Sequence, residues 1–343
     1  MKNKIQINNR RYIGCKTKLL NNIEEAINTF NFNFNEASVF ADIFAGTGVV
    51  ASHFANLGYK TILNDTLYSN YVIYKTFLGA GTVDETKIEN IIIDFNSING
   101  EELEDNYFSR VYGNKYFSIN DAKKIGYIRD QIEINKPNLS EREYYYLITS
   151  LMYATDKIAN TVGHFESFLK KAPQDKNVTL HLLQINPNIR PADIHNIDSN
   201  ELVKRIKCDI AYIDPPYNAR QYVNFYHVLE NLARWDKPTE FEGNSMKFKR
   251  NNLKSDYCRK KAPMLFEELI NNLDTKLIIV SYNNTYKAGS ISSINTISED
   301  EILNVLSKKG KVNKISINYN PFNAGKTGLT SHMEYLYICE VID

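Results

Sequence analysis

The sequence predicts an α/β protein built on a Rossmann-like open sheet, and three stretches support that prediction. Residues 39–57 read as an apolar strand, a glycine turn and a helix. Residues 59–65 read as a second strand that ends in an acid, and residues 208–217 as a strand that ends in Asp-Pro-Pro-Tyr. Ligands bind at the carboxyl ends of the strands in such a sheet, so these strand ends form the candidate site.

The strand at residues 208–213 is followed by the most distinctive turn of the chain. Pro215 and Pro216 cannot continue a strand or a helix, because neither nitrogen donates a hydrogen bond and each φ is fixed. The Asp214 carboxylate and the Pro215 carbonyl can accept N–H bonds from a planar amino group, and Tyr217 can stack on the ring that carries it. A plain strand-ending turn is the ordinary interpretation of Asp-Pro-Pro alone, but the tyrosine and the other motifs favour a binding site.

The glycine turn offers a second element of a binding site. Gly46 and Gly48 let the backbone pass close to a nucleoside, and Asp42 can bond a polar group at the turn. With Ala51 the glycines also satisfy a loose dinucleotide-binding pattern, which is weak by itself. Asp65, at the end of the second strand, can accept bonds from ribose hydroxyls or can cap the helix that begins near residue 66, and the two roles are compatible.

The amino-acid composition indicates what kind of protein this is. The chain has 343 residues, of which 43% are hydrophobic and 24% charged, so a packed core is expected. The net charge of +1 gives no global field for nucleic acid, so any such field must be local. The four cysteines are widely spaced and read as free thiols in a reducing compartment. With no signal core and no membrane-spanning apolar run, we expect a cytoplasmic protein that does not contact a membrane.

The start of the chain carries a glycine and cations ahead of a helix. Gly14 permits close backbone approach, Lys16 and Lys18 place cations nearby, and apolar spacing predicts a helix from about residue 16.

The middle of the chain reads as a helical insertion between strands. We assign residues 1–104 and 180–343 to the catalytic domain and residues 105–179 to the insertion, which is either a DNA-recognition lobe or a simple elaboration. Ser140 and Glu143 form a candidate capping box. Helices are predicted at 67–80, 84–95, 119–134, 141–160 and 200–207, and short strands at 180–185 and around 194.

The last third returns to strands. A helix is predicted at 224–234, another at 299–308, and strands at 276–281, 314–319 and 334–341. Residues 323–330 contain Gly-Lys-Thr but lack the first glycine and the strand-then-helix context of a phosphate-binding loop, so we reject nucleoside triphosphate binding.

Residues 236–262 are polar and locally basic. From Asn244 onward they hold a single acid, Asp256, against seven cations. This segment is the best candidate for contact with DNA phosphates, although a solvated loop is nearly as good an explanation of a charge run. The seven are Lys247, Lys249, Arg250, Lys254, Arg259, Lys260 and Lys261.

Together these motifs resemble the adenine-specific DNA methyltransferases related to the Dam and FokI modification enzymes. The resemblance spans nearly the whole chain, and its most specific part is Asp-Pro-Pro-Tyr. It rests, in chain order, on Arg11-Tyr12-Ile13-Gly14-Cys15-Lys16, Asp42-Ile43-Phe44-Ala45-Gly46-Thr47-Gly48, Asn64-Asp65, Asp198 and Asp214-Pro215-Pro216-Tyr217.

The resemblance implies a seven-stranded, mostly parallel sheet with helices on both faces and one antiparallel hairpin near the end. It also implies S-adenosylmethionine as the cofactor, with no metal. Asp65 would take the ribose hydroxyls and Asp198 the adenine amino group. The remaining implied contacts are Tyr12, Gly14 and Lys16 from the N-terminal segment, and Asp42, Phe44, Ala45, Gly46, Thr47 and Gly48 for the methionine and ribose part.

Two positions depart from the family pattern. Cys15 stands where close relatives often have another glycine, and Ser199 stands where an aromatic residue often follows the acid. The second departure weakens the assignment of Asp198 to the adenine pocket.

The implied reaction methylates the N6 amine of an adenine flipped out of double-stranded DNA, either beside a separately acting restriction endonuclease or as an orphan methylase. Cytosine-N4 methylation is the alternative within the class, but Ser is more frequent there at the position of Asp214. An NAD-dependent oxidoreductase would leave Asp-Pro-Pro-Tyr unexplained, and a catalytically dead DNA-binding module is disfavoured by the intact motif. The target sequence is not readable from one chain.

Overall fold

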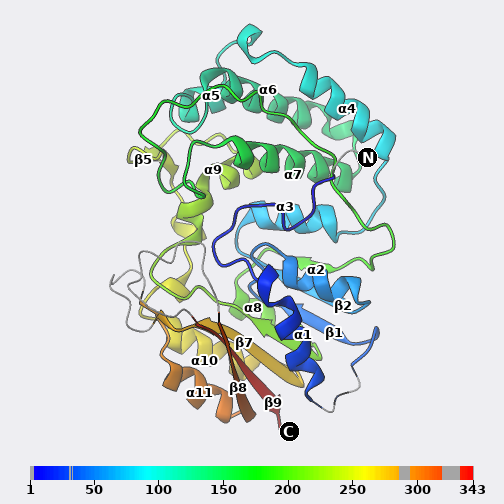
Figure 1. The fold of residues 1–343 in the computed structure, drawn as a ribbon, viewed down its shortest axis with the longest axis vertical. Helices are drawn as coiled ribbons and strands as arrows, with labels where there is room; N and C mark the ends of the chain where they lie inside the picture. Colours follow the sequence, from blue (N-terminus) through cyan, green and yellow to red (C-terminus); the bar gives the residue numbers. More distant parts are fainter. Residues whose placement is uncertain (1–3, 31, 33, 286–293, 319–332, 343) are drawn as a thin grey trace. The chain divides into compact units, whose positions relative to one another are not determined.

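The computed structural model describes residues 4–30, 32, 34–285, 294–318 and 333–342, and the chain divides into two compact units (Figure 1). The helical unit comprises the residues up to Tyr12, Leu67–Asn188 and Val223–Asn252. The sheet unit comprises Ile13–Thr66, Ile189–Tyr222 and the residues from Leu253 onward. Each unit is described below by itself. The Gly-Lys-Thr segment at 323–330 lies outside the described residues.

The sheet unit is built on a seven-stranded sheet with the order β3-β2-β1-β4-β7-β9-β8, counted over the described residues. All neighbouring pairs are parallel except those of β9, which is antiparallel to both β7 and β8. This confirms the expected mostly parallel sheet with one antiparallel hairpin. The strands are β1 (Val39–Asp42), β2 (Lys60–Asn64), β3 (Asp193–His195), β4 (Ile210–Ile213), β7 (Leu277–Asn283), β8 (Gly310–Asn318) and β9 (Met333–Val341).

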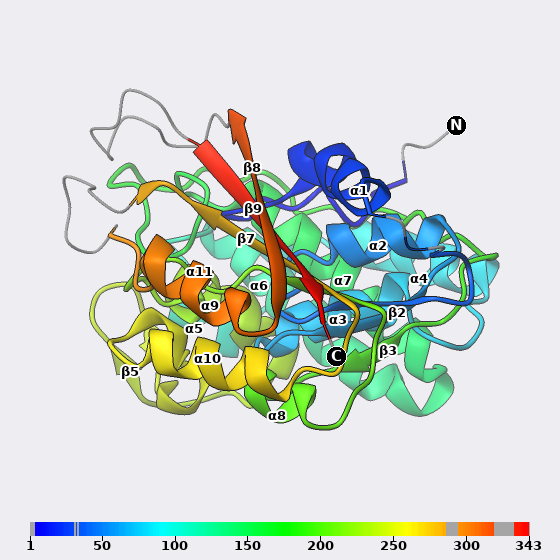
Figure 2. The ribbon, with the colours of Figure 1, turned by 90° about the horizontal axis from the view of Figure 1, so that it is seen from below.

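Helices cover both faces of this sheet, and strand alternation decides which side chains face which helices. Ala41, Ala211 and Ile278 are neighbours in register and share one apolar core with α8, α10 and α11. On the opposite face, Phe40 stacks on Phe54 of α2 at a centroid distance of 3.9 Å. Figure 2 shows α10 and α11 on one side of the sheet and α1 and α2 on the other. The helices of this unit are α1 (Leu20–Asn28), α2 (Val49–Asn56), α8 (Ser199–Val203), α10 (Ala262–Asn272) and α11 (Glu299–Ser307), with 3-10 turns η1 (Thr17–Leu19) and η5 (Asp256–Cys258).

The strand order reverses between β1 and β4. From β1 the chain moves outward through β2 to β3, and β4 then pairs with the other side of β1. Such a reversal leaves a crevice at the carboxyl ends of the two central strands, which is where ligands bind in open α/β sheets. Asp42 ends β1 and Asp214 directly follows β4, so two carboxylates flank this point.

The helical unit is mostly α-helix. The Ser140–Glu143 capping box predicted from the sequence is confirmed at the start of α7. Arg129 of α6 is fully buried and donates to the carbonyls of Leu232 (2.7 Å) and Ala233 (3.1 Å) near the end of α9. The unit contains α3 (Tyr68–Phe77), α4 (Glu85–Ser97), α5 (Tyr107–Tyr112), α6 (Ile119–Asn135), α7 (Glu141–Ile158) and α9 (Tyr222–Arg234), the hairpin β5 (Phe241–Glu242) and β6 (Lys247–Phe248), and 3-10 turns η2 (Gly100–Glu102), η3 (Lys136–Asn138) and η4 (Asn251–Leu253).

Two local expectations were wrong. Residues 180–185 form no strand, because their only β-pairing among the described residues is a single bridge between Leu183 and Ile5. The helix expected at 200–207 ends at Val203. The polar segment at 236–262 is mostly irregular and contains the short elements β5, β6, η4 and η5, and α10 begins at its last residue, Ala262.

The predicted insertion at 105–179 lies inside the helical unit, which extends well beyond it on both sides in sequence. Within the described residues, no helix is long and apolar enough to cross a membrane, and the four cysteines are free thiols.

Candidate active site

The Asp-Pro-Pro-Tyr turn lies at the carboxyl end of β4 and is fixed through its last residue. The Tyr217 carbonyl accepts bonds from the Thr296 backbone N–H (2.8 Å) and from the Tyr282 hydroxyl (3.2 Å). The Tyr217 ring also meets the Tyr282 ring edge-on at 4.7 Å. No donor among the described residues bonds the Pro215 carbonyl. The turn is therefore held rigidly while one of its carbonyls stays available.

Asp214 uses one carboxylate oxygen for the protein and leaves the other available. Its Oδ1 accepts from the Lys16 ammonium at 3.1 Å and from the Tyr217 hydroxyl. Its Oδ2 has no bonded donor in the part of the chain that the structure describes, and the side chain keeps 17% exposure. Oδ2 of Asp214 and the Pro215 carbonyl are thus two acceptors available on one turn, as recognition of an amino group requires.

Four side chains from three separate segments meet in one buried cluster, which we call the Lys16 cluster: Lys16, Asp214, Tyr217 and Glu334. Lys16 lies 2.9 Å from Oε1 of Glu334 and donates to the Tyr217 hydroxyl. The Tyr217 hydroxyl lies 2.6 Å from the same Oε1. Ser281 of β7 donates to that oxygen as well, at 2.8 Å. One ammonium therefore compensates two carboxylates in a site from which water is largely excluded.

The protonation states in this cluster follow from burial and charge. Burial raises the pKa of Asp214 to about 6, with Lys16 lowering it and Glu334 raising it. Burial alone would lower the pKa of Lys16, but the adjacent carboxylates of Asp214 and Glu334 hold it well above its usual range. Asp214 is therefore mostly ionised at neutral pH, and Lys16 remains charged.

Asp42 brings a further carboxyl group to the same face of the sheet. It is 1% exposed, and its Oδ2 accepts from the Ala51 backbone N–H at the start of α2 (3.3 Å). Its Oδ1 is buried without a partner among the described residues. Burial, and then the charge of Asp214, raise the pKa of Asp42 well above its usual range. An unsatisfied buried acceptor next to a glycine turn marks a position where a ligand's donor group would fit.

The glycine turn has the backbone that the sequence predicted. Gly46 (φ 53°) and Gly48 (φ 76°) occupy the left-handed region that only glycine adopts without strain. The Gly46 N–H bonds Oδ2 of Asp65 at 3.0 Å, which ties the turn after β1 to the end of β2. The cap position of α3 is occupied by Leu67, so Asp65 does not fill the helix-capping role that the sequence left open.

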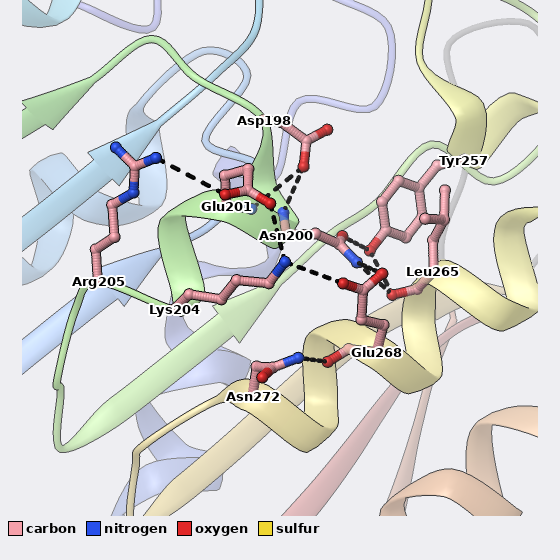
Figure 3. A network of polar contacts seen from close by, with 9 residues as sticks. All are labelled: Asp198, Asn200, Glu201, Lys204, Arg205, Tyr257, Leu265, Glu268 and Asn272. Carbon is pink, nitrogen blue, oxygen red and sulfur yellow. Dashed lines mark hydrogen bonds and ion pairs between the residues drawn. The ribbon is translucent and has the colours of Figure 1, made fainter.

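Asp198 lies at the start of α8 within the polar network of Figure 3. Its Oδ1 accepts from the backbone N–H groups of Asn200 (2.9 Å) and Glu201 (3.3 Å), so one oxygen caps the helix. The Asn200 side chain accepts from the hydroxyl of Tyr257 at 2.8 Å. The Phe44 ring meets the Tyr257 ring edge-on at 5.0 Å. The partly buried Phe44 is thus supported from behind by a tyrosine ring that belongs to the core.

The N-terminal segment supplies Lys16 through a left-handed glycine turn. Gly14 has φ of 82°, and a Cβ there would lie 3.2 Å from the Tyr222 hydroxyl. Cys15 lies beside Thr17, with 3.0 Å between Sγ and Oγ1. Tyr12 belongs to the helical unit, where its ring stacks on Tyr226 at 4.5 Å.

The seven cations of the basic segment do not share one environment. Arg250 is 5% exposed and donates to Glu242 (2.9 Å) and Asn224 (2.8 Å), so its guanidinium is committed to protein partners. Lys247 is partly buried near Glu166, and Lys254 is partly buried too. The exposed members are Lys249, Arg259, Lys260 and Lys261. The segment also divides between units, with 247–252 in the helical unit and residues from 253 in the sheet unit.

Sequence reasoning missed Glu334, Ser281 and Tyr257. Glu334 reaches the site because β9 runs antiparallel, which puts the beginning of β9 at the edge where the parallel strands end. A signal for it exists in the sequence, since Glu334 is the lone charge at the start of a strongly apolar strand. Within the described residues, no group of three His, Cys, Asp or Glu side chains could hold a metal ion.

Comparison with known proteins identifies the family of this chain. The sequence model of a family described as D12 class N6 adenine-specific DNA methyltransferase matches residues 12–297. The modification methylase StsI of Streptococcus sanguinis is 36% identical over 95% of this chain and 50% of its own length. The type II methyltransferase M.NlaIII of Neisseria lactamica is 33% identical over 96% and 98%. The type II methyltransferase M.FokI of Planomicrobium okeanokoites is 32% identical over 92% and 50%.

The chain therefore spans about half the length of StsI and M.FokI, and almost the whole of M.NlaIII.

Proposed function

Because this chain belongs to the D12 class of N6 adenine-specific DNA methyltransferases, we propose that it methylates the N6 amino group of adenine in double-stranded DNA, with S-adenosylmethionine as the methyl donor. The observation that carries the proposal is the pair of available acceptors, Asp214 Oδ2 and the Pro215 carbonyl, at the reversal point of the sheet. The names of the similar proteins support a role in restriction and modification, beside a restriction endonuclease that acts separately.

The residues around the glycine turn fit the proposed cofactor. Its ribose hydroxyls and ammonium group are donors, and this region offers the carboxylates of Asp42, Asp65 and Asp198, including the unsatisfied Oδ1 of Asp42. Its adenine ring would pack against an apolar face, and Phe44, supported by the buried ring of Tyr257, offers one. Gly46 and Gly48 of the turn carry no side chain, so a ligand can approach their backbone closely. When bound, S-adenosylmethionine supplies an electrophilic methyl group on a positively charged sulfur.

The catalytic turn acts on the amine of the target base. An exocyclic amine is a poor nucleophile, because its lone pair is delocalised into the ring. Asp214 and the Pro215 carbonyl accept the two N–H bonds, which favours a tetrahedral nitrogen with an available lone pair. Positioning and electrostatics supply most of the rate enhancement in this scheme. Lys16 keeps Asp214 ionised, so that the carboxylate accepts rather than donates.

The target base must leave the DNA stack to reach this turn, which costs roughly a few kcal/mol. Stacking on the ring of Tyr217 offsets part of that cost.

Methylation in cells tests the function directly. A plasmid that carries the gene is grown in a host without adenine methylases, and single-molecule sequencing then reads every base. We expect N6-methyladenine at one short recognition sequence. Purified protein and tritiated S-adenosylmethionine provide a second readout, since DNA digested to nucleosides separates N6-methyladenine from N4-methylcytosine. Label in N4-methylcytosine would reassign the substrate, and the absence of any label would overturn the proposal.

Cofactor choice gives an independent prediction. Titration calorimetry should show heat with S-adenosylmethionine when a chelator is present, and none with NAD. Asp65→Ala should weaken this binding, because the acid both supports the glycine turn and offers an acceptor to ribose. Asp193→Ala is a matched control, since that acid lies on β3 and is exposed. Heat with NAD alone would favour an oxidoreductase instead.

The basic segment gives a prediction about DNA. We propose that its exposed cations bind phosphates, and we expect Arg259→Ala, Lys260→Ala and Lys261→Ala together to weaken DNA binding. They should also flatten the dependence of log K on log salt by roughly 0.9 for each cation–phosphate pair that the substitutions remove. Affinity is measured by fluorescence anisotropy at several salt concentrations.

The control for that experiment uses three exposed lysines elsewhere in the sheet unit, replaced together: Lys207, Lys276 and Lys308. Lys207 and Lys276 precede β4 and β7, so they lie at the amino ends of parallel strands, at the edge opposite the catalytic turn. An equal change of slope in both triple variants would mean that Arg259, Lys260 and Lys261 make no special contact with DNA. S-adenosylmethionine binding should not change in either variant.

A further inference from the structure

We propose that Glu334 is a positioning residue for methyl transfer, one that holds Lys16 and Tyr217 in place against Asp214 and sets the charge around the catalytic turn. The inference rests on the proposed function and adds a residue from the last strand to it. Glu334 is 3% exposed, so its contacts are made in a nearly dry environment.

The geometry around one oxygen atom carries the inference. Three groups that can donate lie within hydrogen-bonding distance of Oε1 of Glu334: Nζ of Lys16 at 2.9 Å, the Tyr217 hydroxyl at 2.6 Å and Oγ of Ser281 at 2.8 Å. Two of these donors, Lys16 and Tyr217, are also the ones that bond Asp214, so Glu334 and Asp214 hold the same pair of side chains from two sides.

The number of protons in the Lys16 cluster explains why the Glu334 carboxylate matters. The Lys16 ammonium has three N–H bonds, and it has three acceptors, namely Asp214 Oδ1, Glu334 Oε1 and the Tyr217 hydroxyl. The Tyr217 hydroxyl has one proton, which can serve only one carboxylate at a time. Without Glu334, Lys16 loses one acceptor and the Tyr217 hydroxyl loses one of its two carboxylate partners. Both side chains then gain rotational freedom next to the reacting nitrogen.

Charge adds to this positioning. The groups that face Asp214 are Lys16 before η1, Tyr212 on β4, Tyr217 on the turn itself, Glu334 on β9, and Asp42 on β1. Lys16 is the only cation among them. The negative charge of Glu334 raises the pKa of Asp214 and so makes its carboxylate a stronger acceptor for an amine N–H, while Lys16 keeps that carboxylate ionised near neutral pH.

The test compares wild type, Glu334→Gln and Glu340→Gln by tritiated methyl transfer to DNA from pH 5 to 9. Glu340 is the matched control, because it lies on the same strand and outside the Lys16 cluster. For Glu334→Gln we expect kcat to fall by about 10- to 100-fold, because the neutral amide oxygen accepts from Lys16 and Tyr217 more weakly than the carboxylate does. The KM for S-adenosylmethionine should change much less. Glu340→Gln should match wild type.

The pH profile separates positioning and charge from a merely structural role. In wild type, kcat/KM should fall on the acid side near pH 6, where Asp214 takes up a proton. Glutamine removes a negative charge beside Asp214, so the pKa of Asp214 falls and the acid limb moves to lower pH. Lys16→Met removes the cation, so its acid limb should move to higher pH. A slower Glu334→Gln enzyme with an unmoved acid limb would overturn the inference.

Glu334→Asp covers the case in which the glutamine variant does not fold, as judged by thermal melting. Aspartate keeps the charge but is one methylene shorter, so kcat should fall while the acid limb stays at its wild-type position. A wild-type kcat in Glu334→Asp or in Glu334→Gln would refute the positioning role. Wild-type enzyme that methylates no adenine would instead refute the proposed function, so the two failures are distinct.

Discussion

Asp214→Ala is expected to abolish methyl transfer, with kcat at least about 100-fold lower, while the protein stays folded. The alanine removes Oδ2, the acceptor for the amine N–H, and a positioned electrostatic group of this kind is worth about 10²–10³ in kcat. The fold should survive, because Lys16 keeps Glu334 as a partner at 2.9 Å and the turn keeps its bonds through the Tyr217 carbonyl. The measurement is single-turnover transfer of tritiated methyl to DNA, with thermal melting as the check on folding.

The other end of the same strand provides the control. Asp209 precedes β4, and its carboxylate accepts from the Val39 backbone N–H (2.8 Å) and from Lys276 (2.8 Å). Asp209→Ala should therefore lower the melting temperature and leave the rate of the folded enzyme near wild type. Modestly weaker S-adenosylmethionine binding by Asp214→Ala is compatible with the mechanism. Near-normal methyl transfer by Asp214→Ala would contradict the mechanism, since no other described side chain offers an available acceptor on this turn.

Substitution of Tyr217 should have the second largest effect on kcat. Two variants separate the contribution of its ring from that of its hydroxyl. Tyr217→Ala removes both the ring and the hydroxyl, so it should lower kcat strongly and weaken base flipping, with stacking worth ~1–3 kcal/mol per base. Tyr217→Phe keeps the ring face, so it should be milder than alanine. It should still lower kcat by about 10- to 100-fold, because the hydroxyl bonds Lys16, Asp214 and Glu334.

Fluorescence distinguishes the two contributions. Once sequencing has identified the recognition site, DNA with 2-aminopurine at the target base reports flipping separately from transfer. We expect Tyr217→Phe to flip the base normally and transfer slowly, and Tyr217→Ala to fail in both. Normal transfer by the phenylalanine variant would mean that the hydroxyl bonds serve the fold alone. Normal flipping by the alanine variant would remove the stacking role.

Local sequence patterns were enough to predict most of the strands and turns of the sheet unit. The alternating apolar strands, the glycine turn and the two prolines each constrain the backbone within a few residues, so strand ends and their polar side chains are readable. The left-handed Gly46 and Gly48 illustrate this, because a tight turn between strand and helix demands such φ values. What Asp214, Asp65 and Asp198 contribute to catalysis and cofactor binding remains a prediction.

The other site contacts could not be predicted, because they depend on which segments distant in sequence pack together in the fold. Glu334 and Ser281 meet because β9 enters the sheet beside β7 in the opposite direction, and no local pattern encodes that neighbour. Arg250 read as one more cation of a basic run, whereas its burial against Glu242 and Asn224 depends on the folding of the surrounding loop. Glu334 and Arg250 are thus both buried charged residues that bond specific protein partners, although the sequence alone would place them in solvent.

The Lys16 cluster also has a consequence for biosynthesis. Lys16 and Tyr217 are 201 residues apart in sequence, and Tyr217 and Glu334 another 117. Loops of that length close slowly, because closure costs chain entropy before any bond compensates for it. During synthesis, the glycine turn and Asp-Pro-Pro-Tyr also emerge from the ribosome well before β9. On this view, incomplete chains can fold much of the sheet yet leave DNA unmarked until synthesis has passed Glu334.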